Sequence, residues 1–146
     1  MTVEAFVFTF KDGVLSALAH DLKIRITKAE LNDKVATFDA ASLRVESAGG
    51  PLPKTFYGEI EKNIREDVLH SAKFPVIRFE ASDVGADAIT GKLTLHGVTR
   101  EIRVARKGDV VEYELDQRDF GIKPYTAMLG TLKVKPVVKV QVTLSR

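Results

Sequence analysis

The stretch that decides the fold lies at the end of the chain and is Val138-Lys139-Val140-Gln141-Val142-Thr143-Leu144-Ser145. Every second side chain in it is apolar, and those between are polar. Successive side chains of a β-strand point to opposite faces of a sheet, so this period of two buries one face and leaves the other in water. The stretch predicts a half-buried antiparallel strand.

The same alternation recurs in several short segments of the chain, which are residues 22–27, 77–82, 102–104 and 111–115. Residues 3–10 also predict a strand. Turn residues punctuate the chain at 11–13 (KDG), 32–33 (ND), 85–87 (GAD) and 107–109 (KGD). Gly, Asn and Asp tolerate the backbone angles that hairpins require, so several of these segments are predicted to be consecutive hairpins.

One segment breaks this rhythm and predicts an amphipathic helix over residues 54–71. Its apolar side chains fall on one side at helical spacing, namely Phe56, Tyr57, Ile60, Ile64, Val68 and Leu69. The helix follows residues 49–53 (GGPLP), which cannot continue a strand, and stops before Phe74-Pro75, because a residue preceding proline avoids the helical region. A crossing element or lid is expected.

Length and composition indicate a single globular domain over residues 1–146. The chain has 146 residues, of which 45% are hydrophobic and 29% charged. That is enough apolar surface for one core and enough charge for solubility. An all-β chain of this size closes its sheet with about eight strands, which leaves an interior for one small ligand; a β-sandwich is the alternative.

Charge and cysteine content exclude several classes of function. Lys and Arg number 22 against 20 Asp and Glu, with both signs mixed along the chain, so nucleic acid is not an expected partner. The absence of cysteine excludes disulfides, thiolate metal sites and a cysteine nucleophile. The longest apolar run is residues 5–8, far short of a membrane span. With Met1 as the native start and no secretory signal, a cytoplasmic location is expected.

Three passages together resemble the YceI-like family: residues 68–79 (VLHSAKFPVIRF), 91–100 (GKLTLHGVTR) and 118–122 (RDFGI). In that family a helix ends in a phenylalanine-proline-x-isoleucine strand entry, a strand has the pattern G-x-L-T-x-H-G-V-T, and a later segment is R-x-D-F-G or a close variant. The middle motif is the most specific, and the resemblance covers nearly the whole chain.

The resemblance implies an eight-stranded antiparallel lipocalin-like barrel with an elongated apolar pocket. Family members are thought to carry isoprenoid chains, quinones or other long-chain amphiphiles, and many are exported with a signal peptide that this sequence lacks. A carrier or buffer for an isoprenoid, quinone or fatty-acid-like lipid is therefore the expected function. No cofactor is expected besides such a lipid, and a homodimer is left open.

The candidate ligand-binding residues are the apolar side chains of the alternating strands, of the helix and of the apolar segment that follows Lys123-Pro124. They are Phe8, Leu22, Ile24, Phe38, Phe56, Tyr57, Ile60, Ile77, Phe79, Leu93, Leu95, Ile102, Val104, Tyr113, Leu115, Tyr125, Met128 and Val140. For any single one of them the simpler interpretation is that it fills a solid core, since small barrels need interior side chains to reach close packing. The polar head is expected near Tyr57, His70 and Tyr125.

No catalytic or metal site is expected. The three histidines, His20, His70 and His96, show no short ligand spacing, and there is neither a G-x-S-x-G elbow nor a glycine-rich phosphate loop. A hydrogen bond that ties a turn or bulge is expected for His96, and a local ion pair or hydrogen bonds for Arg118-Asp119.

Two other functions are left open by the sequence. One is an enzyme that acts on a lipid-like substrate with His20 and Asp21 at the entrance. The other is a non-binding structural module whose barrel is filled by its own side chains.

Overall fold

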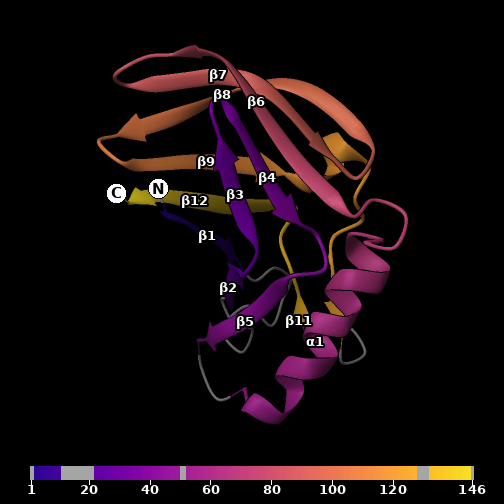
Figure 1. Cartoon of the computed structure of the whole chain (residues 1–146). Helices are drawn as coiled ribbons and strands as arrows, with labels where there is room; N and C mark the ends of the chain where they lie inside the picture. The colour runs from indigo at the N-terminus through magenta and orange to yellow at the C-terminus, as the bar shows by residue number, and fades with distance from the viewer. Residues whose placement is uncertain (1, 11–21, 50–51, 128–131, 146) are drawn as a thin grey trace.

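The computed structural model describes residues 2–10, 22–49, 52–127 and 132–145, and these are mostly β-structure (Figure 1). Its strands are β1 (Thr2–Thr9), β2 (Leu22–Ile26), β3 (Ala29–Asn32), β4 (Val35–Asp39), β5 (Leu43–Ala48), β6 (Val76–Val84), β7 (Ala88–Leu95), β8 (Val98–Lys107), β9 (Val110–Asp116), β10 (Thr126–Ala127), β11 (Leu132–Lys133) and β12 (Val137–Ser145). The helical elements are the 3-10 turn η1 (Lys54–Phe56), the α-helix α1 (Tyr57–Asn63), the π-helical turn η2 (Ile64–Val68) and the 3-10 turn η3 (Gln117–Phe120).

The main sheet is antiparallel and curls into a half-barrel around the core. Within the described residues it has ten strands in the order β3-β4-β6-β7-β8-β9-β12-β1-β2-β5, and β10 pairs with β11 separately. The first and last strands lie side by side, with Thr2 opposite Ser145. The prediction of an all-β fold with antiparallel strands and one helix is confirmed at this level.

The predicted number of eight strands is wrong, because two strands are bent. Only two residues separate β2 from β3, and three separate β4 from β5. At the bend the Thr27 amide donates to the Ser42 carbonyl and the Asp39 amide donates to the Lys28 carbonyl, each at 3.0 Å. The two chain segments therefore stay paired while they turn a corner, and each counts as two strands.

Turn chemistry sets the hairpins as the sequence predicts. Asp33 turns β3 into β4 with φ 56°, and Gly108 turns β8 into β9 with φ 60°. Residues 85–87 join β6 to β7. The predicted turn at residues 11–13 lies outside the described residues.

The motif at residues 91–100 was expected to be one strand, and this is wrong. It is a hairpin, in which β7 ends at Leu95 and β8 begins at Val98. His96 and Gly97 form the turn with φ 55° and 76°. Two consecutive residues of positive φ suit a two-residue hairpin, whose twist matches that of the strands.

The predicted helix is present as one continuous helical stretch of changing geometry, from η1 through α1 to η2. It buries Ile60, Ile64 and Val68. The stretch lies beside β5, at the lower right in Figure 1. No helix of the described residues is long and apolar enough to span a membrane.

Candidate apolar binding cavity

The interior of the half-barrel is hollow, with a cavity of about 370 Å³. This is within the size range of small-molecule sites, roughly 300–1,000 Å³. Its walls are side chains that alternate inward along the strands, together with one face of the helical stretch. The interior is therefore not filled completely by its own side chains.

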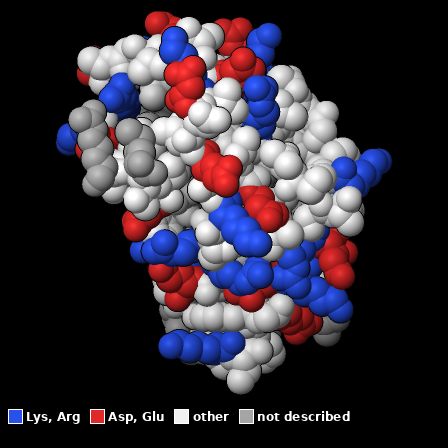
Figure 2. Space-filling view, viewed as in Figure 1, with Lys and Arg blue, Asp and Glu red and all other residues white. Residues whose placement is uncertain are grey.

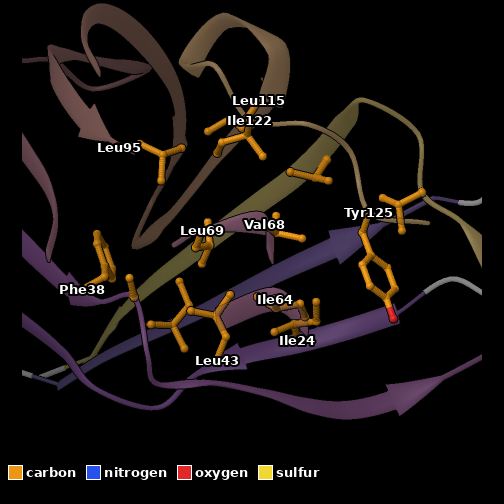
Figure 3. Close-up of a cluster of buried hydrophobic side chains, with 14 of the residues drawn as sticks. Ile24, Phe38, Leu43, Ile64, Val68, Leu69, Leu95, Leu115, Ile122 and Tyr125 are labelled. Carbon is orange, nitrogen blue, oxygen red and sulfur yellow. The ribbon is translucent and has the colours of Figure 1, made fainter. Parts of the chain in front are cut away.

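Most of the predicted ligand-binding residues line this cavity. They are Leu22, Ile24, Phe38, Ile77, Phe79, Leu93, Leu95, Ile102, Val104, Tyr113, Leu115, Tyr125 and Val140. Figure 3 shows several of them pointing toward one another from different strands, with Ile64, Val68 and Leu69 of the helical stretch among them.

Phe8 was expected on the interior face but lies on the outer face. Val7 and Thr9 line the cavity instead. The Lys139 ammonium lies 6.0 Å from the centroid of the Phe8 ring, and the Lys23 ammonium lies 4.5 Å from that of Phe6. Cationic side chains cover the outer phenylalanines, and this cover allows both faces of β1 to be apolar. Alternation in the sequence therefore cannot assign the inner face of this strand.

Phe56, Tyr57 and Ile60 do not line the cavity. Ile60 is buried in the core and the two aromatic residues pack against it. The next turn takes their place, because Ile64, Val68 and Leu69 reach the cavity. The Leu69 amide donates to the Ile64 carbonyl at 2.8 Å, five residues back, which widens the last turn and groups these three side chains on one side.

Other lining residues were not predicted. They are Val7, Thr9, Ile26, Leu31, Asp33, Lys34, Ala36, Leu43, Ile64, Val68, Leu69, Ala81, Val84, Ile89, Arg106, Val111, Gln117, Ile122, Val134, Val138, Val142 and Leu144. Many continue the alternation that identified the strands, such as Ile26 after Ile24 and Val142 after Val140. Met128, His20 and Asp21 lie outside the described residues.

The two ends of the cavity differ in character. At the hairpin end, defined by Asp33, Lys34, Val84, Arg106 and Leu144, the β6–β7 and β8–β9 hairpins turn and β12 ends. In Figure 1 these two hairpins turn at the left, near both chain termini, and the helical stretch lies at the lower right.

The helix end is defined by Thr9, Gln117, Ile122, Tyr125 and Val134, all of which are buried. Its polar groups already have hydrogen-bond partners: the Thr9 hydroxyl accepts from the Leu22 amide at 3.1 Å, and the Gln117 amide group donates to the Lys135 carbonyl at 3.3 Å.

Tyr125 joins this end to the helix. The side-chain amide of Asn63 donates to its hydroxyl at 3.1 Å. Burial raises the pKa of the Tyr125 phenol, the hydrogen bond from Asn63 opposes that rise, and the charges of Glu59 and Asp67 add to it. Tyr125 is therefore held as a neutral, hydrogen-bonded group in the apolar wall.

His70 and His96 lie together next to the helix end, although their spacing in the sequence does not indicate a pair. Their ring centroids are 5.3 Å apart, and the Phe74 ring lies 4.8 Å from that of His96. His96 Nδ1 is 3.2 Å from the Phe120 carbonyl, which ties the β7–β8 turn to η3. Neither histidine lines the cavity. The turn-tying hydrogen bond expected of His96 is confirmed.

Arg118 was expected to act with Asp119, but its ion-pair partner is Asp116, at 2.7 Å. The Arg118 guanidinium lowers the pKa of the Asp116 carboxyl. The Asp116 side chain also accepts from the Arg118 amide, which begins η3. The pair thus stabilises a 3-10 turn, where the sequence suggested a strand.

The outer surface carries both signs of charge. Lys and Arg side chains lie interspersed with Asp and Glu on the face shown in Figure 2. Pairs such as Lys23–Glu46 at 3.3 Å and Lys139–Glu112 at 3.4 Å connect neighbouring strands. An exposed pair of this kind contributes about 0–1 kcal/mol.

The three sequence motifs led us to expect a closed eight-stranded barrel. The structure has instead a hollow half-barrel, which keeps the expected antiparallel strands and apolar interior, and a helical stretch contributes to its wall. The family model described as the YceI-like domain matches residues 2–145. The chain belongs to the YceI-like family. Two of the motifs that carried the resemblance, residues 68–79 and 91–100, meet where His70, Phe74 and His96 pack together.

Solved structures share the fold of this YceI-like chain. BcnA of Burkholderia cenocepacia is 14% identical and superposes with a TM-score of 0.63 over 96% of this chain and 93% of its own. A polyisoprenoid binding domain from Saccharophagus degradans is 11% identical, with a TM-score of 0.62 over 96% of this chain and 90% of that one. No curated protein matches the sequence.

Proposed function

We propose that this YceI-like protein is a carrier or buffer for a long-chain apolar amphiphile, such as an isoprenoid, a quinone or a fatty-acid-like lipid, and is not an enzyme. The observation that carries the proposal is the cavity of about 370 Å³ with almost wholly aliphatic and aromatic walls. Such walls favour a hydrocarbon chain by roughly 0.8 kcal/mol per buried methylene. The solved domain named for polyisoprenoid binding, which has the same fold, adds support.

The cavity also favours this function over a solid structural module. The atoms that line an empty apolar cavity lack van der Waals contacts that they would make in a filled core. An empty cavity therefore lowers the free energy of unfolding. A bound hydrocarbon tail would restore those contacts.

Native mass spectrometry of freshly purified protein, compared with the same sample after denaturation, tests the proposal. We expect extra mass that denaturation releases and whose fragments contain a long hydrocarbon chain. Delipidated protein should then take up hexadecanol or a polyprenol. The absence of both an adduct and uptake would refute the proposal.

A matched pair of variants locates binding in the cavity. Ala36 lines the cavity and Thr37, the next residue of β4, does not. Ala36→Phe should fill part of the space and weaken uptake of hexadecanol by tenfold or more, on the order of the loss from a few buried methylenes. Thr37→Phe should leave uptake unchanged.

A further inference from the structure

We infer that the ligand carries an anionic head group, a carboxylate or a phosphate, which Arg106 and Lys34 bind at the hairpin end of the cavity. This inference rests on the proposed function, because it concerns the head of the amphiphile whose tail fills the cavity. It differs from the sequence-based expectation of a head near Tyr57, His70 and Tyr125, of which only Tyr125 lines the cavity.

Exposure shows where the cavity meets solvent. Among its described lining residues, only Asp33, Lys34 and Val84 are exposed, and all three lie at the hairpin end. Val84 is 48% exposed although its side chain is large and apolar. The residues of the helix end are buried. A chain that enters tail first through the hairpin end leaves its polar head at that mouth.

Arg106 occupies an inward position of its strand. Along β8 the inward residues Ile102 and Val104 line the cavity, and Arg106 continues the alternation as a third lining residue. Its Nε donates to the Gly108 carbonyl at 3.0 Å and its Nη1 to the Gly85 carbonyl at 3.2 Å. Two carbonyls thus hold the guanidinium at the point where the β6–β7 and β8–β9 hairpins meet.

The charge of Arg106 has no carboxylate partner within the described part of the chain, and neither has that of Lys34. The guanidinium keeps N–H donors beyond the two bonds to carbonyls, and a planar guanidinium suits the paired oxygens of a carboxylate or phosphate. Lys34 lies in the β3–β4 turn, where its carbonyl accepts from the Ala81 amide at 2.8 Å.

The two ends of the cavity differ in unused hydrogen-bonding capacity. At the helix end Thr9, Gln117 and Tyr125 each have a protein partner. Among the residues that line the hairpin end, Lys34 and Arg106 are cationic and Asp33 is anionic, so the lining itself has a net positive charge. A negative head group would complete the mouth, and an ammonium head would meet the excess of cations.

Four ligands with the same hydrocarbon tail test the inference: hexadecanoate, hexadecyl phosphate, hexadecanol and hexadecylamine. Delipidated protein should bind the two anions about tenfold more tightly than the alcohol, and the amine no more tightly than the alcohol. Comparison of the carboxylate with the phosphate shows which head is preferred. The preference for anions should decrease as salt increases, since the mouth is partly exposed.

Variants assign the preference to residues. Arg106→Gln should remove most of it, measured as the ratio of the affinity for each anion to the affinity of the same variant for hexadecanol. Lys34→Gln should reduce the preference for anions without disturbing the fold, because Lys34 lies in an exposed turn. Asp33→Asn should increase this preference. Arg103→Gln, an exposed position of the same strand, is the matched control and should have no effect.

The outcomes separate two failures. Equal binding of anions and alcohol, unchanged by Arg106→Gln, would overturn the head-group inference while tail binding stands. Failure of all four ligands to bind, with no adduct in the purified protein, would refute the proposed function itself. An anion preference that Arg106→Gln and Lys34→Gln both leave intact would place the head elsewhere and overturn the inference.

Discussion

At the scale of single residues, Gly97 shows how a short motif is constrained by both backbone and packing. Its φ is 76°, and a Cβ built on it would lie 2.6 Å from the Phe74 ring. Gly108, in the β8–β9 turn, has φ 60° with nothing within 4 Å of such a Cβ. Both glycines have a positive φ that a residue with a Cβ rarely adopts, but only Gly97 also has a close neighbour.

Replacement by alanine should therefore lower the free energy of unfolding by different amounts at Gly97 and Gly108. Gly97→Ala and Gly108→Ala should both destabilise by about 1 kcal/mol through positive φ. Gly97→Ala should cost about 1–3 kcal/mol more, because the Phe74 ring must move from its place against His96. Urea unfolding measures both. Equal losses would show that the Phe74 contact adds nothing.

Tyr125 predicts a dependence of stability on alkaline pH. Its folded pKa is raised above its ordinary value, chiefly by burial. The unfolded chain therefore loses the phenolic proton first, and the free energy of unfolding should be unaffected below about pH 10 and fall as pH rises through the folded pKa.

Tyr125→Phe should flatten that alkaline fall and cost about 1 kcal/mol near neutrality, since the Asn63 amide loses its acceptor. Part of the fall should persist, because burial also raises the pKa of Tyr113. Chemical unfolding from pH 8 to 11 measures this. An identical alkaline fall in the variant would contradict the assignment to Tyr125.

Individual side chains also mark the limit of what alternation can predict. Val140 and Leu115 are on strands with one apolar face, and their inward orientation follows from period two. β1 has Phe6, Val7 and Phe8 in a row, so the inner face of that strand cannot be assigned from sequence. Arg106 follows the inward alternation and lines the cavity. It was not predicted there, because a charged residue is ordinarily expected to be exposed.

At the scale of elements, the helical stretch both lines the cavity and completes an edge of the sheet. β5 is an edge strand in the described sheet. The Val45 amide in β5 donates to the Glu61 carboxylate of α1 at 2.8 Å. A carboxylate thus satisfies a backbone donor that an edge strand would otherwise present to another chain.

Loss of the hydrogen bond between Val45 and Glu61 should lower the stability of the protein and expose the edge of β5 to other chains. Glu61→Ala should lower the free energy of unfolding by about 1–2 kcal/mol and increase aggregation on heating. Glu61→Gln retains an acceptor and should restore most of the loss. Glu59→Ala, an exposed position of the same helix, is the control. Urea unfolding and light scattering measure the effects, and equal behaviour of both alanine variants would refute the role of Glu61.

The elements themselves were predictable to the extent that local chemistry determines them. Asn32-Asp33 and Lys107-Gly108-Asp109 marked real turns. The helical stretch ends at Val68, before the predicted end at residue 71 and well before Phe74-Pro75. The bends at residues 27–28 and 40–42 were not predictable, because hydrogen bonds between distant segments maintain pairing there. For the same reason the sequence suggested eight strands, whereas the main sheet of the described residues has ten.

At the scale of the whole molecule, the cavity depends on how much space the inward side chains leave. Alternation predicts which residues face inward, but close packing or hollowness depends on the curvature of the sheet and the position of the helical stretch. Small lining residues such as Ala36 and Ala81 contribute to the hollow. The sequence was therefore compatible with either a solid or a hollow interior.

The volume of the cavity predicts a limit to useful chain length. A cavity of about 370 Å³ has room for only a limited number of methylene groups. Affinity in a series of linear carboxylates should rise about fourfold per methylene and level off once the cavity is full.

Competition against a fluorescent fatty acid measures the series. Ala36→Phe should shift the plateau to shorter chains, because a phenyl group occupies part of the cavity, and Thr37→Phe should not. Affinity that is flat from the shortest chain would show that the tail binds outside the cavity. A rise that continues without levelling up to the longest chain would show that the half-barrel widens around its ligand.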